Sequence, residues 1–308
     1  MWRKTRRAKL LLFVGFAALI AMNLYTFSLA YPQISVIDSG CCANHPLAKD
    51  FSAFYIGAWR LFNSDPAGVY FHGYLNDGET KILPQPEQYK YLPAFLSLVA
   101  PFLLLSYPNA LIAFDAFQLL LLPIIAFLVY KLVGEKGMLL TFLVGVIALL
   151  LPSISSAGWG FSIAYFWQWK EGQSKVLETF LILFSLFFAK RGNPKLSGLF
   201  LGLSFFDPRF SLVSLPLFLV FNKNRIYVAV GSLAITGVLT NLTLLYPSIG
   251  SGFLSMLLST GLVSGFYPYA FIPFLTVVAI SIVYYEEIMS PIRIWAKNSS
   301  SAIILNPT

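Results

Sequence analysis

The chain has 308 residues, of which 57% are hydrophobic and only 11% are charged. Soluble domains carry about a quarter charged residues, so this composition excludes an ordinary soluble domain and, with apolar runs recurring along the chain, indicates a polytopic membrane protein. The net charge of +8 does not indicate nucleic-acid binding, because most basic residues stand in short clusters between apolar runs, as in a positive-inside topology.

The first apolar run covers residues 10–30 and directly follows the basic start of the chain. It resembles a secretory signal peptide, and Ser28-Leu29-Ala30 resembles a cleavage site. However, its 21 residues are enough to cross a bilayer and exceed the usual apolar core of a signal peptide. We therefore expect an uncleaved first transmembrane helix, and cleavage is the alternative.

Further apolar runs follow along the chain. Candidate spans lie at residues 109–130, 137–157, 173–189, 196–221, 226–246 and 269–285. Two other runs, 92–106 and 253–266, are shorter than the roughly 20 residues that a crossing needs. The sequence predicts an all-α membrane protein of about eight transmembrane helices, if the run 196–221 enters and returns as a hairpin.

The distribution of charge decides the role of the run 92–106. If this run crossed, the basic cluster 190–195 would lie opposite the basic N-terminus, against the positive-inside rule. If it lies along the outer interface, and 196–221 turns back at FFDPRF, all later basic clusters share the cytoplasmic side with the N-terminus. These clusters are 131–136, 190–195 and 223–225. Residues 31–107 then form a long first outer loop with interfacial helices, which holds six of the thirteen acids.

An amphipathic helix is predicted within this loop, in the stretch KDFSAFYIGAWRLF. Its apolar residues recur at helical spacing: Phe51, Phe54, Tyr55, Ala58, Trp59 and Phe62. We expect the helix to lie in the outer interface with this stripe towards the membrane. Asp50 stands at its start, either as a simple N-cap or as a carboxylate held ready to accept a proton from a hydroxyl. The two roles are compatible, because a cap fixes the position of the carboxylate.

The stretch DFSAFYIGAWRLFNSDPAGVY resembles the first-loop signature of GT-C glycosyltransferases, most closely that of glycosyltransferase family 87. The signature resembles D-x-x-x-Y-x-x-A-x-x-L-x-x-G-x-x-x-Y. With slightly loose spacing, the residues that fit it are Asp50, Tyr55, Ala58, Leu61 and Tyr70.

Further matches follow in order. YLPAFLSLVAPFLLL, from Tyr91, resembles the Y-x-P-x-x-x-L-x-x-x-P segment of the family, which is an interfacial helix in this fold. The segment from Gly172 resembles G-Q-x-x-x-L, then a basic R-G, then A-G-x-x-x-G-L-x-x-x-K-P. The resemblance thus implies a GT-C-like module over residues 1–225, and residues 226–308 would add transmembrane helices and a polar tail.

The resemblance implies a transferase in the plasma membrane with its active site on the outer face. It would move a hexose, usually mannose, from a polyprenyl-phosphate donor to a hydroxyl of a glycan, glycolipid or protein, with inversion. No nucleotide, cofactor or metal is implied. Among residues that could bind a cation, His45, His72 and their acidic neighbours show no ligand spacing.

The resemblance also implies roles for single residues. Asp50 would be the general base that takes the proton of the acceptor hydroxyl. The leaving lipid phosphate needs cations, and Arg209 stands where the family places a lysine. Further donor-binding candidates are Arg60, Lys90, Lys175, Gln173 and Tyr55.

Other readings of these residues remain open. Where the family has Lys-Pro, the chain has Asp207-Pro208-Arg209, and Asp207 and Arg209 could simply pair with each other. Lys175 could pair with Glu178 at i+3, and Gln173 could be only a polar residue at a helix start. Asp115 stands inside a predicted span, which marks it for function in general terms. The alternative function is a non-catalytic GT-C-like membrane subunit or a lipid-binding scaffold.

Overall fold

The computed structural model describes residues 49–63, 68–70, 89–150, 153–155, 158–160, 169, 172–260 and 271–289, together with five isolated positions between 14 and 25. The predicted first span and most of the predicted first outer loop lie outside these described residues. What is described is helical, apart from one short antiparallel pair of strands.

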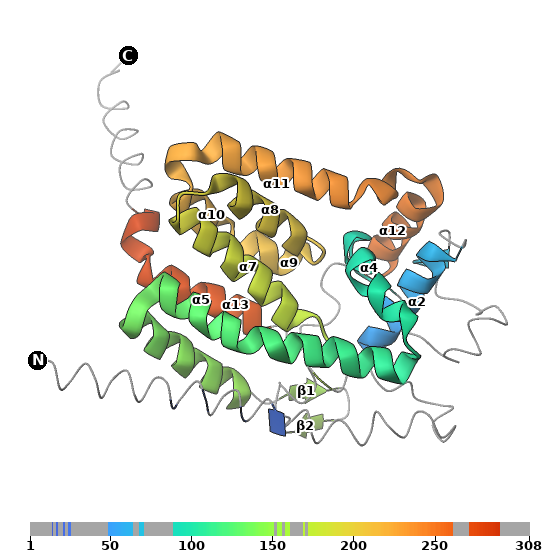
Figure 1. Ribbon diagram of the computed structural model, residues 1–308, viewed down its shortest axis with the longest axis horizontal. Coiled ribbons are helices and arrows are strands. Elements are labelled where there is room, and N and C mark those ends of the chain that lie inside the picture. Colours follow the sequence, from blue (N-terminus) through green and yellow to red (C-terminus); the bar gives the residue numbers. More distant parts are fainter. Residues whose placement is uncertain are drawn as a thin grey trace, which may run out of the picture.

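Two helices of the first loop pack beside the start of a long helix (Figure 1). They are α2 (Lys49–Phe62) and α4 (Ala94–Val99), and α4 continues into the 3-10 helix η3 (Ala100–Leu104). Pro101 stands at the start of η3, where its missing N–H and the crowding of its ring against the preceding turn prevent the regular α-helix from continuing. The unit Ala94–Leu104 is apolar but short, which confirms that the run 92–106 is not long enough to cross.

The long helix α5 (Tyr107–Leu150) is bent at Gly134, where φ is +66°. The bend falls between the predicted spans 109–130 and 137–157, so the predicted division is confirmed. Its first part, Tyr107–Gly134, is the one helix in the described part of the chain that is long and apolar enough to cross a membrane.

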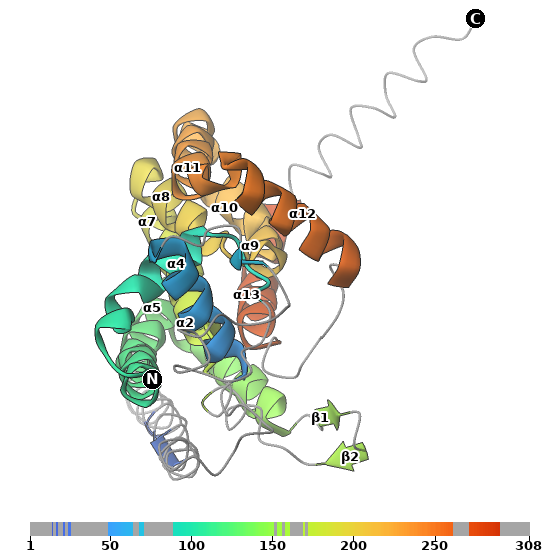
Figure 2. The same ribbon diagram turned by 90° about the vertical axis from the view of Figure 1, so that its right-hand side faces the viewer.

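The prediction that a helix continues to residue 157 is wrong. The helix ends at Leu150, and β1 (Ser153–Ser155) and β2 (Gly158–Gly160) then form a short hairpin. A proline at position 152 explains the end, because proline removes a helix donor and commonly follows a helix terminus. Figure 2 shows the hairpin at the edge of the molecule, away from the helices.

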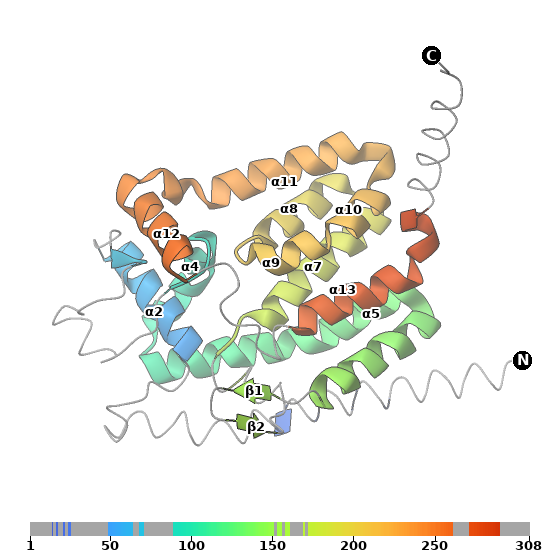
Figure 3. The same ribbon diagram turned by 180° about the vertical axis from the view of Figure 1, so that it is seen from behind.

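The remaining helices form a bundle with α5. In chain order they are α7 (Lys175–Lys190), α8 (Pro194–Ser204), α9 (Pro208–Val213), α10 (Leu215–Phe221), η4 (Lys223–Arg225), α11 (Ile226–Thr240), η5 (Leu242–Leu245), α12 (Pro247–Thr260) and α13 (Phe271–Val283). Helix α8 packs between α7 and α11, whereas α7 and α13 pack on α5. Helix α12 returns to α2 and α4, as Figures 1 and 3 both show, and Phe253 of α12 lies 5.4 Å from the ring of Tyr70.

The run 196–221 enters and returns, as predicted. The hydroxyl oxygens of Ser204 and Ser211 lie 2.8 Å apart across the turn at FFDPRF. Further from the turn, the side chain of Asn222 donates to Oγ of Ser197 at 3.0 Å. These two pairs place α9 and α10 antiparallel to α8.

Two glycines bring α8 and α11 close together. A Cβ atom on Gly198 would lie 2.3 Å from the carbonyl oxygen of Ala229, and one on Gly202 would lie 2.6 Å from Cβ of Thr236. Small residues spaced in this way let the backbones of membrane helices approach closely. The G-x-x-x-G of the motif is therefore a packing surface.

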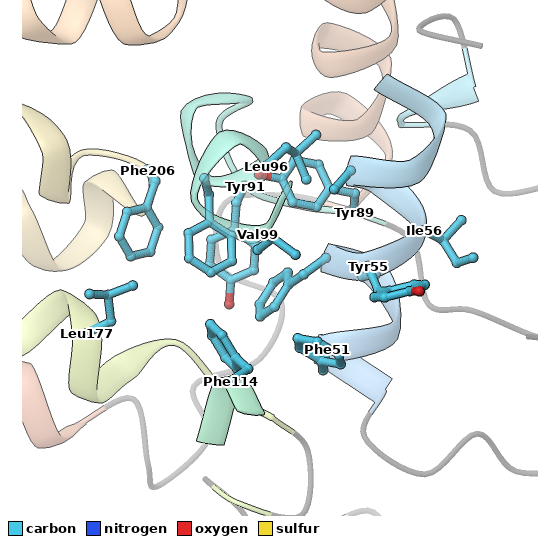
Figure 4. Close-up of a cluster of buried hydrophobic side chains, with 14 of the residues drawn as sticks. Phe51, Tyr55, Ile56, Tyr89, Tyr91, Leu96, Val99, Phe114, Leu177 and Phe206 are labelled. Carbon is cyan, nitrogen blue, oxygen red and sulfur yellow. The ribbon is translucent and has the colours of Figure 1, made fainter. Parts of the chain in front are cut away.

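The apolar stripe of α2 packs on protein. Phe54 meets Phe95 edge to face at 4.6 Å, and Phe51 lies 5.2 Å from Phe114 (Figure 4). The prediction that this stripe faces the membrane is wrong for these residues, and only the far end of the helix, at Phe62, is exposed. Periodicity identifies an apolar face, but it does not tell whether lipid or protein covers that face.

The predicted basic clusters lie together at one end of the bundle. The ammonium of Lys190 donates to the carbonyl of Leu132 at 2.5 Å, and Ser232 donates to the carbonyl of Lys195 at 2.7 Å. The end of α5 before its bend, the α7–α8 turn and the start of α11 therefore adjoin. Helices α2 and α4 lie at the opposite end (Figure 1).

Candidate functional site

The predicted base and the G-Q motif meet at the end of the bundle opposite the basic clusters. The side-chain amide of Gln173 donates a hydrogen bond to Oδ2 of Asp50, although the two residues are 123 positions apart. Asp50 is partly exposed and is the second residue of α2, so it lies inside the first turn and not at the N-cap. A carboxylate is still favoured at this helix end by the free N–H groups and the helix dipole.

Gly172 makes this contact possible. Its φ is +62°, a left-handed conformation that residues with a Cβ rarely adopt. A Cβ here would also lie 2.5 Å from Cβ of Phe51 and 2.8 Å from Cδ1 of Leu111. The glycine of the motif therefore lets the chain turn into α7 between α2 and α5, and the next residue is Gln173.

A buried amide of α5 also contacts this turn. Nε2 of Gln118 donates to the carbonyl of Gln173 at 2.7 Å, and its Oε1 accepts from the N–H of Leu177 at 3.4 Å. Sequence reasoning missed Gln118. The available signal was a second polar side chain, three residues after Asp115, on an otherwise apolar span.

Lys175 lies in a buried ionic cluster. Its ammonium is 3.0 Å from Oε2 of Glu178, contacts Oδ2 of Asp207, and lies 5.4 Å from the ring centre of Tyr91. The three charged side chains are at most 2% exposed. The predicted i+3 pairing of Lys175 is confirmed, and Asp207 pairs with Lys175, whereas the side chain of Arg209 lies outside the described residues. The two carboxylates more than neutralise the positive charge of Lys175, so this cluster offers no net positive charge.

The other predicted donor-binding residues differ in exposure. Arg60 is buried and donates to the carbonyl of Gly68 at 2.5 Å, which ties the end of α2 to the turn after it. Tyr55 is buried and donates to the carbonyl of Leu105 at 2.7 Å, and burial raises the pKa of its hydroxyl. Lys90 is exposed between the buried rings of Tyr89 and Tyr91. Of these cations, Lys90 alone is presented to solvent.

The Y-x-P segment and the FFDPRF turn lie against each other. The N–H of Leu92 donates to the carbonyl of Phe206 at 3.0 Å, and the rings of Phe95 and Phe206 stack at 4.6 Å. Through Lys175 and Asp207 the same turn contacts the start of α7. The first-loop signature, the Y-x-P segment, the G-Q motif and the FFDPRF turn thus converge at one end of the bundle, whereas the basic R-G at residues 191–192 lies at the other end.

Asp115 is the remaining acid at this end. It is fully buried in α5, and neither carboxylate oxygen has a hydrogen-bond partner in the part of the chain that the structure describes. The structure therefore places it near Gln118 on the buried face of α5, but not in the ionic cluster.

The model of glycosyltransferase family 87 matches residues 89–280, well over half of the chain. The chain belongs to glycosyltransferase family 87. Enzymes of this family are membrane glycosyltransferases that do not in general depend on a metal or cofactor. No group of three or more His, Cys, Asp or Glu that could hold a metal occurs among the described residues. No curated protein and no solved structure matches the chain.

The family match covers a different range of residues from the motif resemblance. It begins after α2, so Asp50 lies outside it and the case for this residue rests on its contact with Gln173. It continues to residue 280, which extends the relationship through α11, α12 and most of α13.

Proposed function

We propose that this family 87 glycosyltransferase moves a hexose, mannose, from a polyprenyl-phosphate donor to a hydroxyl of a glycan, glycolipid or protein. The observation that carries the proposal is the carboxylate of Asp50, partly exposed and held by Gln173 among four motif segments. One base without a protein nucleophile indicates a single displacement with no covalent intermediate. Because the acceptor oxygen attacks C1 from the side opposite the leaving phosphate, the reaction inverts the anomeric centre.

In the proposed mechanism Asp50 is the general base. Its carboxylate accepts the proton of the acceptor hydroxyl as that oxygen attacks C1 of the sugar. The bond between C1 and the phosphate oxygen breaks, and the polyprenyl phosphate leaves with the electron pair. The amide of Gln173 orients the carboxylate, since it holds Oδ2 from the side of α7.

The leaving phosphate requires a cation. Lys90 is the best candidate, because it is exposed beside the Y-x-P segment whereas Lys175 is already compensated and Arg60 bonds to Gly68. Arg209, in the first turn of α9, is the second candidate.

The proposed setting is a plasma membrane crossed about eight times, with the basic clusters in the cytoplasm and Asp50 on the outer face. Helix α7 joins the two ends over 16 residues, about 24 Å, which approaches the thickness of the hydrocarbon core. An exposed apolar stripe on α5 suits contact with lipid, and it consists of Phe117, Leu120, Ile124 and Phe127.

The test is transfer by the purified protein in lipid, with radiolabelled polyprenyl-phosphate-mannose and a panel of glycolipid, glycan and peptide acceptors. We expect Asp50→Asn to lower the transfer rate at least about 100-fold, the usual contribution of a general base. Glu286→Gln, an exposed acid after α13, is the matched control and should retain transfer. Equal rates for wild type and Asp50→Asn would overturn the assignment. A wild-type protein that binds the donor without transfer to any acceptor would instead support the non-catalytic alternative.

A further inference from the structure

The start of α7 lacks the cap that its sequence offers. Ser174 occupies the N-cap position, but its side chain makes no cap hydrogen bond, and its hydroxyl has no partner among the residues that the structure describes. The first N–H groups of a helix have no partner within the helix, so another group must satisfy them in a buried site.

Gln118 supplies this function from a different helix. Its Oε1 lies 3.4 Å from the N–H of Leu177, the third residue of α7, which is the donor that an N-cap side chain commonly binds. Its Nε2 donates at 2.7 Å to the carbonyl of Gln173, just before the helix. An amide is suited to this position because it offers a donor and an acceptor at the same time.

The same turn carries the contact to the proposed base. The backbone of Gln173 is held by Gln118, and its side chain holds Asp50. Gly172, directly before it, is confined between Phe51 and Leu111. A continuous series of hydrogen bonds therefore runs from α5, through the start of α7, to the first turn of α2.

We propose that Gln118 is a positioning residue for glycosyl transfer: by fixing the turn that enters α7, it sets the orientation in which Gln173 presents the carboxylate of Asp50. The inference rests on the proposed function of Asp50. Gln118 is fully buried and acts through Gln173, without contact to the reacting atoms. A displaced base loses rate because proton transfer depends on near-attack geometry, in which about 1 Å can change the rate 100-fold.

The experiment replaces Gln118 by Met, which keeps the length of the side chain and removes both hydrogen bonds. We expect kcat with polyprenyl-phosphate-mannose to fall on the order of 10-fold to 100-fold, with little change in KM for the donor. Gln118→Asn, one methylene shorter, keeps the amide but cannot bridge both partners, and we expect a smaller loss of kcat. If the Met variant does not fold, the loss of kcat in Gln118→Asn tests the proposal in its place.

The matched control is Asn222→Leu. Asn222 is a buried amide at the basic end, where it donates to Oγ of Ser197 at 3.0 Å and to the carbonyl of Phe218 at 2.9 Å. Its replacement should lower the melting temperature as Gln118→Met does, but leave kcat unchanged. A kcat loss that is equal in both variants, or an unchanged kcat in Gln118→Met, would overturn the proposal.

A double-mutant cycle separates positioning from general stability. In a Gln173→Met background the link to Asp50 is already lost, so Gln118→Met should lower kcat much less than in wild type. A full additional loss in this background would mean that Gln118 does not act through Gln173. A failure of the proposed role of Asp50 can be distinguished from a failure of this proposal. In that case Asp50→Asn would transfer sugar at the wild-type rate, and the kcat of the Gln118 variants could still be measured.

Discussion

Gly172 combines a left-handed backbone with a lack of space for any side chain. Alanine there should destabilise the protein by about 1–2 kcal/mol through its φ alone, with a further loss from contacts at 2.5 Å and 2.8 Å. Gly192 is the matched control, because its φ is +72° but nothing lies within 4 Å of an added Cβ. Thermal unfolding in lipid should show a larger decrease in melting temperature for Gly172→Ala than for Gly192→Ala. Glycosyl transfer should be lost only in Gly172→Ala. Equal effects would mean that the clash relaxes without consequence.

Asp115 allows a second prediction for a single residue. A buried polar group without a partner is destabilising, and an apolar side chain of similar size removes that penalty. Asp115→Leu should therefore raise the stability of the protein by about 1–3 kcal/mol, measured as an increase in melting temperature. The same change at Asp207 should lower it, because Lys175 then loses one of its two carboxylates. A decrease for Asp115→Leu would show that this acid has a partner in the membrane.

At the scale of elements, the ionic cluster joins α7 to the turn between α8 and α9. Lys175→Met would leave Glu178 and Asp207 as neighbouring buried carboxylates without their cation, and removing one partner of a buried pair costs about 3–5 kcal/mol. Replacing all three residues together by Met, Leu and Leu should restore most of this loss, since apolar groups of similar volume often substitute for buried ion pairs without cost. Lys195→Met, at an exposed position, is the control for loss of a lysine. A triple variant as unstable as Lys175→Met would contradict the argument.

The elements themselves were largely predictable from the sequence. The division of α5 near residue 134 and the return of the chain at FFDPRF follow from apolar run lengths and charge parity. The surroundings of α2 were not predictable, because an apolar stripe suits lipid and protein equally well, and here Phe54 packs on Phe95.

The contacts within the site were predictable only where they are local. The pair Lys175–Glu178 follows from i+3 spacing on one helix. The contact of Asp207 with Lys175 depends on where the hairpin turn meets α7, and the sequence alone suggested Arg209 as the partner of Asp207. Likewise, a sequence shows a serine at the start of α7, but not that Gln118 of another helix takes over the capping of Leu177.

At the scale of the whole molecule, the basic clusters and the proposed site lie at opposite ends of one bundle. The basic end is built from the bend of α5, the ends of α7 and α10 and the start of α11, and the other end holds Asp50 and Gln173. Parity counting predicts this separation without any knowledge of side-chain contacts, because each crossing exchanges the side on which the next loop lies. The two ends of the bundle should therefore face opposite sides of the membrane, and labelling at one position in each end can test this orientation.

The two positions are Ser97 and Asn224, small polar residues that are both exposed, the first in α4 and the second in η4. In a background with Cys41 and Cys42 changed to Ser, we expect Ser97→Cys to react with a membrane-impermeant maleimide on intact cells. Asn224→Cys should react only after permeabilisation, because positive-inside orientation places its basic neighbours Lys223 and Arg225 in the cytoplasm. The reverse pattern would put Asp50 on the cytoplasmic side, and labelling of both from outside would show that an odd number of crossings does not separate α4 from η4. Since neither substitution removes a charge, a changed topology caused by the variants themselves is not expected, and the labelling reports the orientation of the native chain.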